Sequence, residues 1–62
     1  MCLSTAYDKA AQPDRAIMSN IQRVKIDGNK IICADIIENE IEIFGKLISI
    51  DLIEGKIIID ID

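Results

Sequence analysis

The chain has 62 residues, a formal net charge of −4 and half of its residues hydrophobic, with Tyr7 and Phe44 as its only aromatic residues. This length allows a single domain, 1–62. A domain of this size buries only about 60% of the surface that its unfolded chain exposes. Its stability is therefore marginal unless a covalent cross-link, a metal ion or a partner chain adds to it. The acidic balance disfavours a nucleic-acid binder, which usually carries a basic stripe, and no segment reaches the roughly 20 apolar residues of a transmembrane helix.

The first third of the chain predicts a short strand and a loop. Residues 2–7 contain β-branched and aromatic residues, which favour a strand. Residues 8–14 are polar and contain Pro13, so they predict a loop. Residues 15–20 have helical spacing of their apolar residues after Pro13, but they fit a short strand about as well. The strand is preferred on the family resemblance described below.

The middle of the chain alternates between strands and turns. Apolar and charged residues alternate over residues 21–27, which predicts a half-buried strand. Residues 27–30, Asp-Gly-Asn-Lys, predict a tight hairpin turn because glycine supplies the positive φ that such turns require. Residues 30–37 are nearly continuously apolar, which predicts a strand covered on both faces. Glu38-Asn39 predicts the next turn.

The last third repeats this organisation. Residues 40–43 alternate between glutamate and isoleucine, and Gly45 then predicts a bulge or a sharp bend. Residues 47–53 resume the strand pattern, residues 54–55 predict a turn, and residues 56–61 predict the last strand. The residues expected to share one face of the strand over 47–53 are Ile48, Ile50 and Leu52. Five to six short strands at this spacing predict an all-β fold, a small antiparallel barrel.

Isoleucine dominates the hydrophobic content. The chain has 16 isoleucines and two aromatic residues, so the core must be built mainly from isoleucine. Isoleucine is β-branched and packs well on pleated, half-buried surfaces. This is more apolar surface than so small a domain can cover, and we therefore predict a homodimer in which a second copy covers part of it.

Cys2 is the candidate metal ligand. Removal of Met1 would leave Cys2 with an α-amine and a thiol that can chelate one metal ion, and sulfur with nitrogen suits nickel, copper or zinc. One chain then offers two strong donors, or three if the amide nitrogen of Leu3 loses its proton, so a four-coordinate site needs a second chain and holds about one ion per dimer. Planar coordination would favour Ni(II) and tetrahedral coordination Zn(II), and the sequence leaves the geometry open. The alternative for Cys2 is a small buried residue on the first strand.

The remaining chemistry-bearing residues are interpreted as structural. Cys33 lies in the most apolar segment and is expected to be a small core residue, with a Cys2–Cys33 metal pair as the alternative. The alternating Glu38, Glu40 and Glu42 fit a solvated face better than a site for a hard cation. Because the chain has no histidine, no side-chain imidazole could activate a serine or threonine, and we expect no enzyme.

The N-terminal segment lacks the basic region and the apolar stretch of a secretory signal peptide. We therefore expect a cytoplasmic protein, with no membrane partner. Thiols are kept reduced in that compartment, so both cysteines are expected to be free thiols or ligands and not a disulfide.

The opening Met1-Cys2-Leu3-Ser4 and the segments 17–31, 41–51 and 56–59 resemble the CooT-type nickel-binding family. The resemblance implies a small Sm-like or SH3-like barrel that forms homodimers and binds nickel through the cysteine at position 2, here Cys2. It also implies a metallochaperone-like role in the maturation of a nickel enzyme, carbon monoxide dehydrogenase, with that client or its maturation factors as further partners. Members have been described as predicted RNA-binding proteins, so an Sm-like interaction module that binds RNA is the alternative function.

Overall fold

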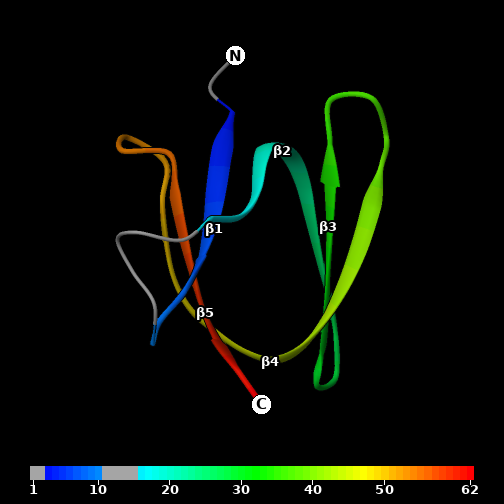
Figure 1. Ribbon diagram of the computed structural model, residues 1–62, viewed down its shortest axis with the longest axis vertical. Helices are drawn as coiled ribbons and strands as arrows, with labels where there is room; N and C mark the ends of the chain where they lie inside the picture. The colour runs from blue at the N-terminus through cyan, green and yellow to red at the C-terminus, as the bar shows by residue number, and fades with distance from the viewer. Residues whose placement is uncertain (1–2, 11–15) are drawn as a thin grey trace.

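The computed structural model describes residues 3–10 and 16–62 and is drawn in Figure 1. The described part contains five strands and no helix. The strands are β1 (Ser4–Asp8), β2 (Ala16–Asp27), β3 (Lys30–Asp35), β4 (Glu40–Asp51) and β5 (Lys56–Ile61). The predicted all-β class is confirmed, and so is the strand alternative for residues 16–20, which form the first part of β2. Cys2 and residues 11–15 lie outside the described residues.

The strands close into a ring. They pair in chain order, and β5 returns to pair with β1. The predicted antiparallel arrangement is confirmed for the four pairings of consecutive strands. The closing pairing of β1 with β5 is parallel, which the sequence pattern did not predict. Because each of the five strands runs opposite to the one before it, the first and the last must run in the same direction.

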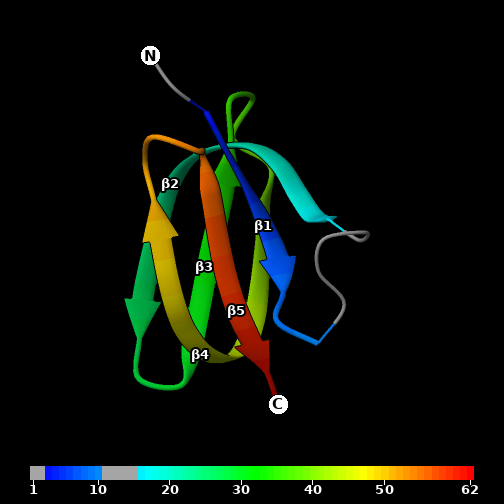
Figure 2. The ribbon, with the colours of Figure 1, turned by 90° about the vertical axis from the view of Figure 1, so that its left-hand side faces the viewer.

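The two longest strands, β2 and β4, each pair with one strand along their first part and with another along their second part. Each has 12 residues and changes partner near its middle. In β2 the pairing passes from β1 to β3 at Ile21, directly after Asn20, which has a φ of 58°. In β4 it passes from β3 to β5 between Phe44 and Gly45. Figure 2 shows the resulting curve of β4.

Gly45 lies in β4 at a point where its backbone passes close to β5. A Cβ atom at this position would overlap the backbone carbonyl oxygen of Asp60 in β5 and lie 3.0 Å from the Cα atom of Ile61. Only glycine allows this approach. The ladder becomes irregular two residues later, between Leu47 and Ser49. The bulge or bend predicted at Gly45 is therefore found at the point where β4 changes partner.

The strand predicted over residues 30–37 ends two residues early, at Asp35. The Asp35 carboxylate accepts hydrogen bonds from the backbone N–H groups of Ile37 and Asn39, at 3.0 and 2.9 Å. An aspartate that bonds the backbone ahead of it stabilises a turn in competition with the strand ladder. Ile36 and Ile37 therefore lie in the turn, with 51% and 72% of their surface exposed.

The strand predicted over residues 47–53 also ends early, at Asp51. Its carboxylate accepts hydrogen bonds from the backbone N–H groups of Ile53 and Glu54, both at 3.0 Å. Leu52 and Ile53 lie in the turn that follows, 72% and 99% exposed. The single apolar face predicted for Ile48, Ile50 and Leu52 is not a buried face, because all three are exposed.

The core is built from isoleucine, as predicted. The buried residues that pack together in the interior are Ala6, Ile21, Ile31, Cys33, Ile43, Ile57 and Ile59. In the last strand, predicted over residues 56–61, the consecutive residues Ile57, Ile58 and Ile59 are all buried, whereas Ile61 is 40% exposed. No helix in the described part of the chain is long and apolar enough to cross a membrane.

Candidate functional site

The start of β1 packs against the turn between β4 and β5. The backbone N–H of Thr5 donates a hydrogen bond to the carbonyl oxygen of Gly55, at 2.8 Å. Gly55 has a φ of +68°, and a Cβ atom there would lie 3.1 Å from the carbonyl oxygen of Leu3. Glycine therefore serves both the backbone conformation and the close contact. Cys2, the predicted ligand, lies outside the described residues and is joined covalently to Leu3 at this end.

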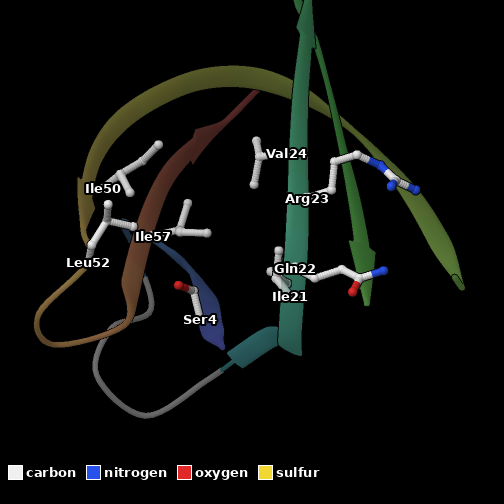
Figure 3. A pocket seen from close by; sticks show the side chains of 8 residues that line it. All are labelled: Ser4, Ile21, Gln22, Arg23, Val24, Ile50, Leu52 and Ile57. Atoms are coloured by element: carbon white, nitrogen blue, oxygen red, sulfur yellow. The ribbon is translucent and has the colours of Figure 1, made fainter. Parts of the chain in front are cut away.

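An apolar pocket of about 230 Å³ opens beside the start of β1. Its lining residues come from β1, β2, β4, β5 and the β4–β5 turn: Ser4, Ile21, Gln22, Arg23, Val24, Ile50, Leu52 and Ile57. Figure 3 shows Gln22 and Arg23 extending away from the other six side chains. Five of those six side chains are aliphatic, and the sixth is Ser4.

The pocket is open because two strand edges are not joined there. From Arg23 onward β2 pairs only with β3, and from Gly45 onward β4 pairs only with β5. The unpaired edges lie on opposite sides of the pocket (Figure 3). Ile50 lies opposite the buried Ile57 in the β4–β5 ladder, and residues opposite each other in a ladder share one face of the sheet. Ile50 therefore belongs to the core face, yet it is 47% exposed.

Cys33 is a core residue, as predicted. It lies in β3 with none of its surface exposed, and burial raises the pKa of its thiol. The thiolate is the form that binds a metal, so a buried thiol with a raised pKa is a poor ligand. Within residues 3–10 and 16–62, no group of three or more histidine, cysteine, aspartate or glutamate side chains is placed to hold a metal ion.

The three glutamates are solvated, as predicted, but only Glu40 and Glu42 lie in a strand, β4, whereas Glu38 lies in the turn before it. Glu38, Glu40 and Glu42 are all exposed. Glu38 forms an ion pair with Arg23, and the hydrogen bond between them raises the pKa of Arg23. Glu42 lies 3.7 Å from the ammonium group of Lys30. Glu38 and Glu42 are thus paired with basic side chains, and the three glutamates are not grouped so that they could hold a metal ion.

A family model described as CO dehydrogenase accessory protein CooT matches residues 1–60. The chain belongs to this family. The resemblance seen in the sequence is thereby confirmed, and the match includes position 2, where this CooT family member has Cys2. The family is described as accessory to an enzyme, which is compatible with the expectation that the chain is not itself an enzyme. Searches of the curated proteins and of the solved structures found no match.

The turns predicted at residues 38–39 and 54–55 are present, but sequence reasoning missed that each begins two residues earlier, with exposed apolar residues. Both follow one short pattern, Asp-Ile-Ile-Glu-Asn over residues 35–39 and Asp-Leu-Ile-Glu-Gly over residues 51–55. In both, the aspartate accepts a hydrogen bond from the N–H two residues ahead. The leading aspartate is the signal that could have placed these turns, because aspartate commonly initiates turns in this way.

Proposed function

We propose that this CooT family member is a nickel-binding accessory protein, similar to a metallochaperone, that acts as a homodimer in the maturation of carbon monoxide dehydrogenase in the cytoplasm. The observation that carries the proposal is the match of residues 1–60 to the accessory family. The closed ring of five strands supports the finer interpretation as an Sm-like or SH3-like barrel. Nickel is the cargo in this role, and the client enzyme or its maturation factors receive it.

Cys2 is the proposed nickel ligand. The chain has two cysteines, and Cys33 is enclosed in the core. After removal of Met1, Cys2 offers a thiolate and an α-amine on one residue, and this sulfur and nitrogen pair suits Ni(II). Two donors per chain fill only two of the four positions on a four-coordinate ion. The other two donors therefore come from Cys2 of a second copy.

Exposed apolar surface supports the homodimer. In the part of the single chain that the structure describes, the exposed large hydrophobic residues are Ile26, Ile36, Ile37, Phe44, Ile48, Ile50, Leu52, Ile53 and Ile61. Exposed apolar side chains that gather into a large patch commonly mark a contact with another protein. A second copy would remove part of it from water, which is favourable in proportion to the area covered.

Titration of the purified protein with nickel tests this function. We expect binding of about one Ni(II) per two chains, with sulfur-to-metal charge-transfer absorption in the near ultraviolet. Binding should weaken below neutral pH, because the thiol and the amine must both lose protons before they coordinate. Absence of nickel binding by the wild-type protein, or binding without the charge-transfer band, would contradict the proposal.

RNA binding, the alternative function, is expected to be weak. The net charge of −4 repels a phosphate backbone, and two of the basic residues, Arg23 and Lys30, already pair with glutamates. The shortage of aromatic residues leaves few platforms for stacking bases. A gel shift at physiological salt should show no submicromolar complex, and such a complex would favour the RNA-binding module instead.

A further inference from the structure

The ring has a gap between the second parts of β2 and β4. Arg23–Asp27 of β2 pairs along one edge with β3, and Gly45–Asp51 of β4 pairs along one edge with β5. Within residues 3–10 and 16–62, no strand pairs with the other edge of either segment. Two hollows lie along this gap: the pocket beside the start of β1, and a wider groove of about 520 Å³ toward the β2–β3 turn. Backbone N–H and C=O groups at such an edge are free to pair with another chain.

Residues of the core face are left exposed on both sides of the gap. Val24 and Ile26 lie opposite Cys33 and Ile31 in the β2–β3 ladder, and both of those partners are buried. Because residues opposite each other in a ladder share one face of the sheet, Ile26 belongs to the core face. It is nevertheless 59% exposed, as Ile50 is 47% exposed across the gap. An additional strand beside β2 would cover this part of the core face.

The other face of this part of β2 is basic. Arg23 and Lys25 alternate along the strand with Val24 and Ile26, and Figure 3 shows Val24 pointing toward the gap and Arg23 away from it. The guanidinium group of Arg23 is paired with Glu38. Lys25 is exposed and forms no ion pair with any residue that the structure describes.

The edges of the gap are positively charged on an otherwise acidic protein. The two unpaired segments contain three basic residues against two acidic residues, which gives them a net charge of +1, whereas the whole chain carries −4. Lys46 of β4 lines the groove and, like Lys25, forms no ion pair within the described part of the chain. Complementary charge selects one partner over another. The gap therefore favours an occupant with acidic side chains.

The alternation along β2 specifies the sequence of such an occupant. Side chains of a strand point alternately to opposite faces, so an added strand would place every second residue beside Val24 and Ile26 and the others beside Arg23 and Lys25. Aliphatic residues match the first pair, because they would be covered together. Acidic residues match the second pair, because opposite charges on neighbouring strands attract.

We propose that an extended segment of another protein, with alternating aliphatic and acidic side chains, adds as a strand to the free edge of β2 over Arg23–Asp27. In strand addition of this kind, hydrogen bonds between the main chains provide affinity and alternate side chains provide specificity. The surface goes beyond the nickel-binding role proposed above and does not depend on it, because no residue of this edge is a proposed nickel ligand.

Titration with a short peptide tests this surface. The probe is an acetylated and amidated peptide of alternating glutamate and valine, added to isotopically labelled wild-type protein at physiological salt. Nuclear magnetic resonance should show shifts of the backbone amide signals of Arg23–Asp27. A peptide in which lysine replaces glutamate should bind about 10-fold more weakly, because like charges then face each other. The net charge of −4 by itself predicts the opposite order, since it attracts the lysine peptide.

Lys25→Glu is the diagnostic variant. It should bind the glutamate peptide about 10-fold more weakly than the wild type does, because it replaces an attraction with a repulsion. Lys25 is exposed, so circular dichroism should show an unchanged fold. Lys56→Glu is the matched control: it makes the same change of charge at an exposed position of β5 and should bind the peptide as the wild type does.

Modified peptides test the main-chain hydrogen bonds. Two peptides are compared, one with every valine N-methylated and the other with every glutamate N-methylated. Alternate residues of a strand direct their N–H groups to opposite sides, so only one of the two sets faces β2. One modified peptide should therefore lose binding. Equal binding of both modified peptides and the unmodified one would show that no strand is added.

Other outcomes also overturn the proposal. These are the absence of shifts at Arg23–Asp27, tighter binding of the lysine peptide by the wild type, or equal binding of the glutamate peptide by Lys25→Glu and the wild type. Shifts of the same amide signals when the protein alone is concentrated would show that a second copy occupies the edge instead. Cys2→Ser should lose nickel and still bind the peptide. A failure of peptide binding thus leaves the nickel site standing, and nickel retained by Cys2→Ser leaves this surface standing.

Discussion

Replacing Cys2 with serine is expected to abolish nickel binding and leave the fold intact. A hydroxyl is a harder and far less acidic donor than a thiol, so it neither deprotonates near neutral pH nor matches the preference of nickel for sulfur. The fold should survive because the core consists of residues between Ala6 and Ile59. Isothermal titration with Ni(II) measures the loss, and circular dichroism verifies the fold.

Cys33→Ser provides the matched control, since it removes the other thiol. It should keep full nickel binding and lower the free energy of unfolding by about 1–3 kcal/mol, because a hydroxyl replaces a small apolar group at a fully buried position. The reverse result, with nickel retained by Cys2→Ser and lost by Cys33→Ser, would show that the N-terminal site is wrong.

Gly45→Ala is expected to cause a large loss of stability, although it adds only one methyl group. The added Cβ atom would overlap the carbonyl oxygen of Asp60, and both atoms belong to paired strands that cannot separate without losing ladder hydrogen bonds. The overlap can be removed only if the backbone shifts at the point where β4 changes partner. We expect the free energy of unfolding to fall by about 3 kcal/mol, a large part of the stability of a small domain.

Urea unfolding at a fixed protein concentration measures this loss, because the apparent stability of a dimer depends on concentration. Ser49→Ala is the control: Ser49 lies in the same strand, is exposed, and should change stability by no more than about 0.5 kcal/mol. Equal stability of the two variants would mean that the contact between Gly45 and β5 does not constrain the fold.

The sequence alone determined the local features of this protein. Alternation of isoleucine with charged residues located most of the strands, since a strand with one buried face repeats every two residues. The apolar surroundings of Cys33 placed it in the core, and Gly45 marked the bend. The family, too, was recognisable from the residues themselves, beginning with Met1-Cys2.

Strand ends were less predictable, for a local reason. Ile36 and Ile37 continue an apolar run, and Leu52 and Ile53 extend a strand pattern, so hydrophobicity alone assigns all four to strands. The hydrogen bonds of Asp35 and Asp51 end those strands instead. A periodic pattern records which residues are apolar and does not record the competition between a side-chain carboxylate and the ladder.

Only the tertiary structure decided how the ring closes and where it stays open. The parallel seam between β1 and β5 joins segments about as far apart as the chain allows, and no local pattern reports such a pairing. The exposure of Ile50 likewise arises because β2 and β4 bend toward other partners and leave a gap between their free edges. Whether an isoleucine is buried thus depends on which strands pack against it in space. The sequence around it shows only which face of its own strand it occupies.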